Sequence, residues 1–427
     1  MFSLFNKKKY QPTVTPEDKD WVEKNIIWFI EIFGLDKLKE QPFISPAIEN
    51  FPYTNLKDAS QFQKLFEQLC GYWNLNPNEI VVKFFDDIRS KQWTTLMPQG
   101  KFNEAAGLYD QIYTTAEKRF NIQLAKSNLT NQQLLVSVIA HELAHVKLLG
   151  GNYINRNDPD MEPLTDLASI YFGFGIFLAN SVQTKDIHWI SRSGYLPNQL
   201  ISYTNALICY ITKHDAKNYI AFLNSNTTDL FKKDYEFLSN TNNTALTNDK
   251  VSECESTYKM NKQIAEGFEK RNFEKVIEGS KKLLETNPRN ITAFNNIGYA
   301  LLQQRQYQEA IDQFTRAIDI DPYWDYPYNN RGYCKLQLGD IDSAYEDLFY
   351  SFEMNPGNSF SWRNLGAYYL AIHEFDKALQ HFEEADKIDP KTELINFYLA
   401  QTHLKLGNTE LAKKYLYKSK ELNEYND

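Results

Sequence analysis

Two histidines and a glutamate stand in the sequence at a spacing that suits a metal ion. The segment HELAH begins at His141, continues with Glu142 and ends at His145. Residues four apart on a helix lie on one face, so both imidazoles can point at the same ion. Glu142 would lie beside that ion and could take a proton from a water molecule bound to it. These residue types at this spacing predict a zinc site that activates water for hydrolysis.

A zinc site of this kind needs a third protein ligand, and two acids downstream could supply it. Glu162 and Asp166 follow a helix-start sequence at residues 158–160 and fall one turn apart on the same face of a second predicted helix. Three interpretations remain open: Glu162 is the ligand, Asp166 is the ligand, or both acids only stabilise the first turn of their helix. The nearby histidines favour a ligand role for one of the two acids.

The elements that would position these side chains can be recognised in the flanking sequence. Residues 130–149 are mostly apolar and end at two glycines, which predicts a buried helix with a clear stop. A charged set on such a helix is costly unless its members are paired or bound to metal. Residues 121–125 alternate between polar and apolar and predict a strand. That strand could be the sheet edge that holds an extended substrate, or it could be purely structural.

The HELAH segment followed by Glu-xxx-Asp resembles the gluzincin class of zinc metallopeptidases, over roughly residues 120–180. The resemblance implies an α+β zincin-like domain with a small sheet, hydrolysis of peptide bonds and Zn²⁺ as the cofactor. It implies the following roles: His141, His145 and Glu162 as zinc ligands, Glu142 as the catalytic base, and Asp166 as acceptor of a ring N–H from a ligand histidine. The gap from His145 to Glu162 is shorter than in the best-known gluzincins. Four residues are candidates for stabilising the oxyanion of the reaction, with none favoured: His188, Tyr195, Tyr203 and His214.

Two other functions compete with a peptidase. The chain could be a non-catalytic interaction scaffold whose metal site is structural or degenerate. A weaker alternative is the hydrolysis of a non-peptide amide at the same site. The presence of Glu142 next to an intact set of candidate ligands favours the peptidase.

A 34-residue period runs through the second half of the chain. It is carried by three series: Pro288, Pro322, Pro356 and Pro390; Ala310, Ala344, Ala378 and Ala412; and Gly298, Gly332 and Gly366 with Ala400. Small residues let two antiparallel helices approach closely, and the proline ends the second helix of each unit. The pattern resembles the tetratricopeptide repeat family. It predicts an all-α solenoid of five units, with atypical first and last units: 257–290, 291–324, 325–358, 359–392 and 393–426.

Asparagine recurs at the sixth position of three successive units, at Asn296, Asn330 and Asn364. A side-chain amide both donates to and accepts from peptide groups, so a ladder of amides could hold an extended protein segment in the repeat groove. Solvated asparagines on an unused groove are the alternative. Neighbouring residues that could add selectivity are Tyr299, Tyr326, Tyr333, Phe360 and Arg363.

Composition narrows the classes of partner and compartment. The chain has 427 residues, a formal net charge of −9 and 42% apolar residues, which argues for globular domains and against a nucleic-acid partner. Four cysteines without metal-knuckle spacing predict free thiols and a cytoplasmic protein. The longest apolar run is too short to span a membrane.

The sequence therefore predicts a mainly α protein with two domains. The expected metallopeptidase domain covers residues 1–240, an Asn/Thr-rich linker covers 241–256, and the repeats cover 257–426.

Overall fold

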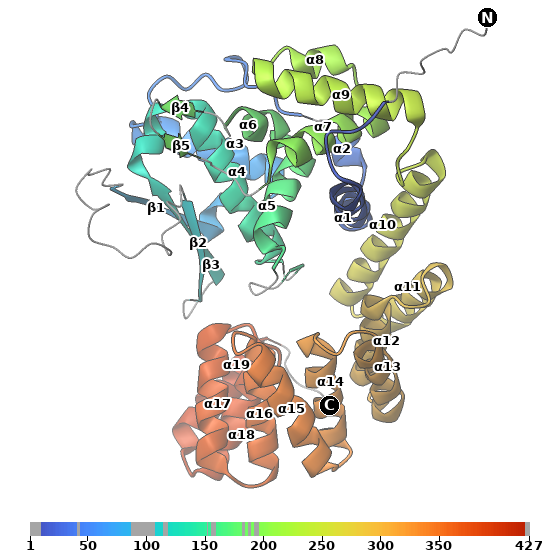
Figure 1. Ribbon diagram of the computed structural model, residues 1–427. Coiled ribbons are helices and arrows are strands. Elements are labelled where there is room, and N and C mark those ends of the chain that lie inside the picture. Colours follow the sequence, from blue (N-terminus) through green and yellow to red (C-terminus); the bar gives the residue numbers. More distant parts are fainter. Residues whose placement is uncertain are drawn as a thin grey trace, which may run out of the picture. The chain divides into compact units, whose positions relative to one another are not determined.

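Figure 1 shows a computed structural model of the chain, which describes residues 10–40, 43–86, 107–113, 118–151, 153–154, 159–181, 184–186, 189–191 and 196–422. The chain divides into two compact units with the main boundary between Tyr258 and Lys259. Helices dominate both units, as the mainly α fold class predicts. Unit 1 is the part before this boundary, and unit 2 is the part after it.

Unit 1 begins with three helices: α1 (Pro16–Phe33), α2 (Asp36–Glu40) and α3 (Ala59–Trp73). The start of α1 is capped by Thr15, whose side chain accepts a hydrogen bond from the backbone N–H of Asp18. The helix ends at Gly34, whose φ of +84° lies in the region that glycine adopts without strain.

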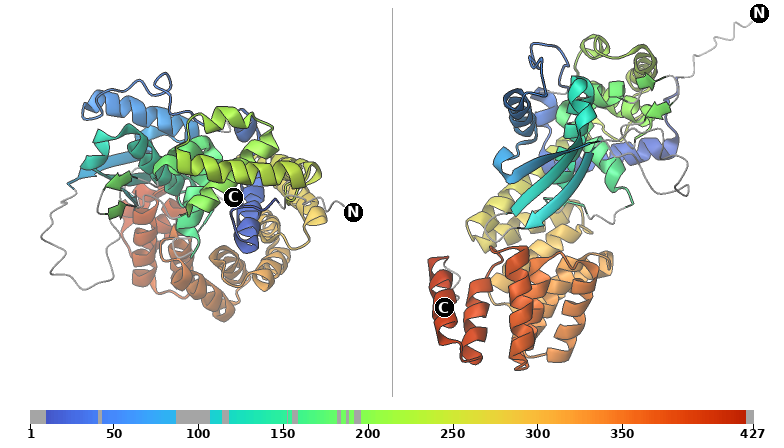
Figure 2. Two further views of the ribbon diagram at one scale, coloured as in Figure 1. Left: turned by 45° about the horizontal axis from the view of Figure 1, so that its top comes forward. Right: turned by 90° about the vertical axis from the view of Figure 1, so that its left-hand side faces the viewer.

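A three-stranded sheet follows, and Figure 2 shows its strands side by side. After the short helix η1 (Pro77–Glu79) come β1 (Ile80–Phe85), β2 (Gly107–Tyr113) and β3 (Lys118–Ala125), in the order β1-β3-β2. β1 runs parallel to β3, with Ile80 opposite Phe120. The strand predicted at 121–125 is confirmed as part of β3. It is the central strand, however, so the suggestion that it forms a substrate-binding edge is wrong.

The helices that carry the candidate site pack beside this sheet. They are η2 (Lys126–Thr130), α4 (Gln132–Leu148), α5 (Met161–Ser169), the π-helix η3 (Ile170–Phe174) and α6 (Gly175–Ser181). α4 contacts α3, α5 and α6, so it is enclosed on several sides. Nearly all its residues from Leu135 onward are buried, which confirms the predicted buried helix. The core of unit 1 therefore surrounds the segment that bears the histidines.

The remaining elements of unit 1 are a short hairpin and three helices. They are the hairpin of β4 (Thr184–Asp186) and β5 (Trp189–Ser191), then α7 (Asn198–Thr212), α8 (Ala216–Ile220) and α9 (Ser225–Thr241). α7 packs along α9, and its residues from Leu200 to Cys209 are buried. The unit is thus a helical body with one small sheet and one short hairpin in the described part of the chain.

The linker predicted at residues 241–256 is wrong. α10 (Asn248–Glu269) covers residues 248–256, and Leu246 and Cys254 are buried in the core of unit 1. The backbone N–H of Ala245 donates to the carboxylate of Glu23, which is itself buried. Two apolar residues, one before α10 and one within it, thus bury a segment whose overall composition is polar, and the average composition does not reveal them.

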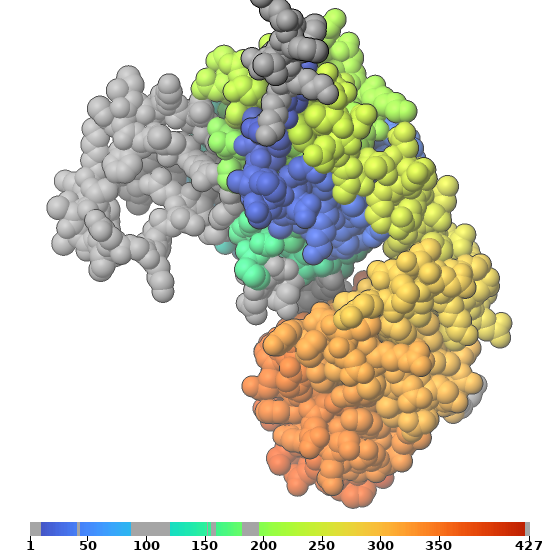
Figure 3. Space-filling view, turned by 45° about the vertical axis from the view of Figure 1, so that its right-hand side comes forward, coloured from blue at the N-terminus to red at the C-terminus, as the bar shows by residue number. Residues whose placement is uncertain are grey.

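Unit 2 continues as a stack of helix pairs, with the second half of α10 pairing with α11. The helices are α11 (Phe273–Thr286), α12 (Ile291–Gln303), α13 (Tyr307–Ile320), α14 (Asp325–Gln337), α15 (Ile341–Met354), α16 (Ser359–Ala371), α17 (Phe375–Ile388), α18 (Ile395–Lys405) and α19 (Thr409–Glu421). In Figure 3 the surface of unit 2 passes gradually from yellow to orange, so segments that follow one another in sequence lie next to one another within this unit. Each pair spans one 34-residue period.

The glycines of the period stand where the paired helices touch. A Cβ atom at Gly298 would lie 2.7 Å from the ring of Phe314, and one at Gly366 would lie 2.6 Å from the ring of Phe382. The first helix pair lacks the glycine of the period. Its helices come close at Gly279 instead, where an added Cβ atom would lie 2.8 Å from the side chain of Ile264. Small residues therefore set the helix spacing in the atypical first unit as well.

Among the described residues, every helix is either too short or too polar to cross a lipid bilayer.

Candidate functional site

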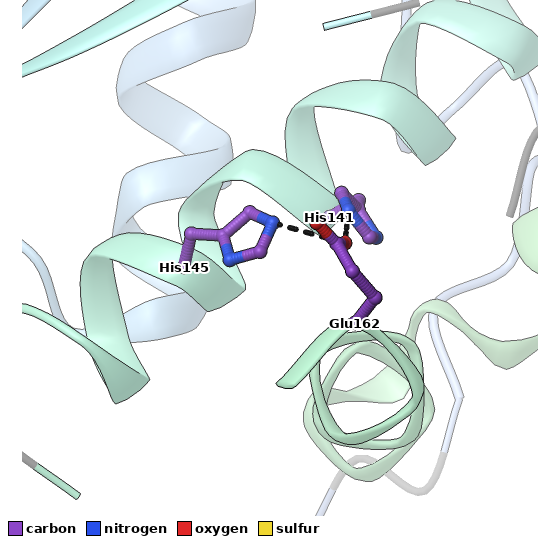
Figure 4. A group of neighbouring side chains, drawn as sticks. All are labelled: His141, His145 and Glu162. Carbon is purple, nitrogen blue, oxygen red and sulfur yellow. Dashed lines mark hydrogen bonds and ion pairs between the residues drawn. The ribbon is translucent and has the colours of Figure 1, made fainter. Parts of the chain in front are cut away.

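Helix α4 presents both histidines from a firmly anchored position. Its start is capped by Asn131, whose side chain accepts a hydrogen bond from the backbone N–H of Leu134. His141 and His145 project from the same face of the helix, as their spacing predicts, and Figure 4 shows them directed at Glu162. The side chain of His145 is 6% exposed and that of His141 is 15% exposed.

Helix α5 lies against α4 and supplies the acidic partner. Nε2 of His141 lies 3.1 Å from Oε2 of Glu162, and Nε2 of His145 lies 3.4 Å from the same oxygen. The donor atoms of the three residues all lie within 4.8 Å of one another. The fold thus brings together the three residues predicted as zinc ligands, at one crossing of two helices.

Asp166 occupies a different place from Glu162. Its Oδ1 lies 2.8 Å from Nδ1 of His141, and its Oδ2 accepts a hydrogen bond from the backbone N–H of Leu196 at 2.9 Å. Only 1% of Asp166 is exposed. Asp166 therefore contacts Nδ1 of His141, the position that the gluzincin resemblance implies. Glu162 instead lies against the Nε2 atoms of both histidines.

The second histidine has an orienting partner that the sequence did not suggest. Oγ1 of Thr165 lies 3.3 Å from Nδ1 of His145 and donates to the carbonyl of Met161 at 2.8 Å. A hydroxyl has one proton to give, so toward His145 it acts as acceptor and Nδ1 carries the ring proton. Nε2 of His145 is then left with its lone pair for an ion. The only signal in the sequence was that Thr165 falls one turn after Glu162.

The charges of the cluster support cation binding. Burial alone would raise the pKa of Glu162, but its contacts with the imidazoles of His141 and His145 lower it to about 2, so this carboxylate stays ionised. Burial would likewise lower the pKa of His141, but the carboxylates of Asp166 and Glu162 raise it to about 10. Burial lowers the pKa of His145. Two acids gathered around two imidazoles form an anionic setting that favours a cation.

Glu142 follows His141 on α4 and is 3% exposed. Its Oε2 is buried and has no hydrogen-bond partner among the described residues. Burial, opposed in part by His141, raises the pKa of Glu142 to about 7. A buried polar atom without a partner is costly, and its position beside a cluster of ligand atoms is what a catalytic base requires.

These residues fit a zinc ion by the chemistry of their donors. Two imidazole nitrogens and one carboxylate oxygen form a ligand set that zinc accepts in catalytic sites. The Nδ1 atom of each imidazole has a hydrogen-bond partner, Asp166 for His141 and Thr165 for His145, as is usual for histidines that bind a metal through the other ring nitrogen. Glu162 is 29% exposed, so the cluster can be reached from its side.

Two of the four candidates for an oxyanion donor lie among the described residues, and their hydrogen bonds go to residues outside this cluster. Tyr203 is fully buried and donates to Glu23, and burial raises its pKa far above the usual value. His214 lies beyond the end of α7, with its backbone N–H bonded to the carbonyl of Cys209. His188 and Tyr195 lie outside the described residues.

The predicted groove residues of unit 2 are largely engaged with one another. The amide of Asn364 donates to Oδ1 of Asn329 at 3.0 Å, and only 1% of Asn364 is exposed. Arg363 is also buried, with its guanidinium bonded to the carbonyl of Glu393. The structure therefore leaves Asn364 and Arg363 little room to hold a peptide.

The other groove residues are half-buried. Asn330 donates to Asn295 at 3.3 Å. The hydroxyls of Tyr333 and Tyr398 lie 3.0 Å apart, and the hydroxyl of Tyr299 bonds to Glu393. The role of these residues, and of the half-buried Asn296, in peptide binding stays a prediction.

Comparison with protein families finds the tetratricopeptide repeat at residues 291–323 and again at 395–426. Both matches fall in register with the units predicted from the 34-residue period. Unit 2 contains tetratricopeptide repeats. Such arrays present an extended concave surface, and unit 2 is a protein- or peptide-binding module.

Several solved structures are similar to part of the chain. A crystal structure of MamA matches at 20% identity over 38% of this chain and 97% of its own, with a TM-score of 0.30. The first tetratricopeptide domain of human RPAP3 matches at 22% identity over 29% of this chain and 98% of its own, with a TM-score of 0.27. The same domain of Spaghetti (RPAP3), bound to the HSP90 peptide SRMEEVD, matches at 22% identity over 27% and 93%, with a TM-score of 0.25. No curated protein matches the sequence.

Proposed function

We propose that unit 1 is a zinc-dependent peptidase and that the repeats of unit 2 recruit its protein substrates or partners. The observation that carries the proposal is the convergence of two imidazole Nε2 atoms on one oxygen of Glu162. The unpaired buried oxygen of Glu142, next to His141 in the chain, adds the base that hydrolysis needs.

The residues of the cluster have separate tasks in this proposal. His141, His145 and Glu162 hold the ion, while Asp166 and Thr165 keep the ring protons on the Nδ1 atoms. When bound, zinc supplies a Lewis acid that polarises a peptide carbonyl and lowers the pKa of water. Glu142 accepts a proton from the attacking water and delivers it to the leaving amine.

Metal analysis of the purified chain tests the ligand assignment. We expect one zinc per chain, and we expect its loss in His141→Ala and in His145→Ala. Glu142→Gln should retain zinc and lose hydrolysis of a protein substrate such as casein, because it removes the base and keeps the ligands. Unchanged zinc content in both histidine variants would overturn the metal site.

A non-catalytic scaffold is the second candidate function. It is favoured by one observation, that both family matches fall within the repeats of unit 2. If Glu142→Gln and the wild type bind zinc equally and neither cleaves any protein offered, the scaffold is the better description.

We also propose that the protein works in the cytoplasm. All four cysteines are buried and unpaired, which is the usual state of thiols in a reducing compartment.

A further inference from the structure

Unit 2 contains a cavity of about 360 Å³, a size that suits a side chain or a small ligand. It is lined by three aromatic rings, one amide and two opposite charges: Phe268, Phe273, Tyr299, Gln303, Arg271 and Glu393. Phe268 and Tyr299 meet edge to face, with ring centroids 5.8 Å apart. We call this cavity the Glu393 pocket.

The Glu393 pocket exists because distant repeats meet. Phe268 and Arg271 belong to the first repeat and Tyr299 to the second, whereas Glu393 lies in the turn that precedes α18 of the fifth repeat. In an ordinary solenoid each repeat contacts only its neighbours. Here the hydroxyl of Tyr299 donates to Oε2 of Glu393 at 3.0 Å, across 94 residues of sequence. The 34-residue period gives no sign of this contact.

The carboxylate of Glu393 is held in a fixed orientation. Its Oε2 accepts from Tyr299 and faces the amide nitrogen of Gln303 at 3.5 Å. Burial, followed by the charge of Glu393, raises the pKa of Tyr299 to about 12, so this hydroxyl remains a donor. The other oxygen, Oε1, lies 3.8 Å from Nη1 of Arg271, which is longer than a hydrogen bond.

Arg271 is held weakly in its place. Its side chain is 62% exposed, lies over the ring of Phe273 and donates to Gln303 at 3.3 Å. Exposed ion pairs of this kind contribute little, so another cation could displace Arg271 from Glu393 at small cost.

We propose that the Glu393 pocket binds a lysine or arginine side chain of a partner protein. The incoming cation pairs with Oε1 of Glu393 in place of Arg271, and its aliphatic stem lies along Phe268 and Tyr299. The fixed negative charge of Glu393 disfavours an acidic side chain in the same cavity. The inference rests on the protein-binding role of the repeats and not on the zinc centre.

Titration of the full-length chain with capped amino acids, followed by saturation-transfer NMR of the ligand, tests this inference. The probes are Nα-acetyl-lysine amide, Nα-acetyl-arginine amide and Nα-acetyl-glutamate amide, which differ only in the side chain. We expect saturable binding of the first two and none of the third. Glu393→Gln keeps an acceptor for Tyr299 and should weaken lysine binding about five- to tenfold. Glu410→Gln, in an exposed side chain of the same unit, is the matched control and should change nothing.

Arg271→Gln gives the sharpest outcome, because it removes the competing cation. It should strengthen binding of the lysine probe severalfold. Weaker binding in this variant, preference for the glutamate probe, or equal affinity in Glu393→Gln and the wild type would each overturn the inference. The titration needs neither metal nor cleavage, so its failure would leave the proposed peptidase intact.

Discussion

Each histidine of the cluster is oriented by its own residue of α5. Asp166 holds Nδ1 of His141, and Thr165 holds Nδ1 of His145. Both Nε2 atoms then face Glu162, so a single helix, α5, carries the candidate ligand and both orienting residues. The roles of these residues can be separated because they act on different atoms.

The first prediction ranks the two acids. Glu162→Ala should remove zinc, because it deletes a ligand oxygen. Asp166→Ala should keep zinc but weaken its binding by about 10- to 100-fold, the usual effect of losing a residue that orients a ligand. Competition with a chromophoric chelator measures both affinities. The opposite ranking would show that Asp166 is the ligand.

The second prediction concerns Thr165. Thr165→Val removes the acceptor of the Nδ1 proton of His145 and should weaken zinc binding about tenfold. Thr204→Val is the matched control, because Thr204 is also buried in a helix and donates to the carbonyl four residues before it. Its zinc affinity, measured by the same competition, should equal that of the wild type. Equal losses in the two variants would indicate a general effect of destabilisation.

At the scale of elements, glycine has opposite effects in the two units. Gly366 on α16 faces the ring of Phe382, whereas Gly71 on α3 has no described atom within 4 Å of an added Cβ. Alanine ordinarily stabilises a helix relative to glycine, but only where the methyl group has room.

The third prediction follows from this contrast. Gly366→Ala should lower the free energy of unfolding of unit 2 by about 1–3 kcal/mol through overpacking against Phe382. Gly71→Ala should instead stabilise unit 1 by about 0.5–1 kcal/mol. Urea denaturation followed by circular dichroism measures both changes. A stabilised Gly366→Ala would mean that α16 and α17 are further apart than the structure shows.

At the scale of the whole chain, the segment after α9 is tied to the N-terminal helix. Glu23 on α1 is 1% exposed and accepts from the hydroxyl of Tyr203 at 2.7 Å and from the backbone N–H of Ala245 at 2.9 Å. Lys19 pairs with the same carboxylate at 3.0 Å. One buried acid thus joins α1, α7 and the segment before α10.

The fourth prediction is that residues 241–256 resist protease in the wild type. Glu23→Ala should make this segment the first to be cut, because each group that loses its acceptor costs about 1–3 kcal/mol of local stability. Asp20→Ala, an exposed position on the same helix, is the control. Limited proteolysis with mass spectrometry locates the cuts. Early cleavage of the wild type between residues 241 and 256 would contradict this prediction and support the flexible linker that the composition predicts.

Features that depend on local spacing follow from the amino-acid sequence alone. The histidines at positions 141 and 145 share a helix face because one turn contains 3.6 residues, and the 34-residue period specifies helix pairs because each pair must bury the same positions. The fold class and the repeat boundaries could therefore be predicted from residue types and intervals.

Features that depend on how the helices cross come only from tertiary packing. Glu162 and Asp166 lie one turn apart on one face, and only the packing of α5 on α4 places the first among the converging atoms and the second behind His141. The same holds for Thr165, for the buried Asn364, for the segment around Leu246 and for the meeting of Glu393 with Tyr299. Some of these contacts join residues that are distant in sequence. Others involve one of two residues that lie on the same helix face, and the helical period does not indicate which of the two side chains will be buried or will make the contact.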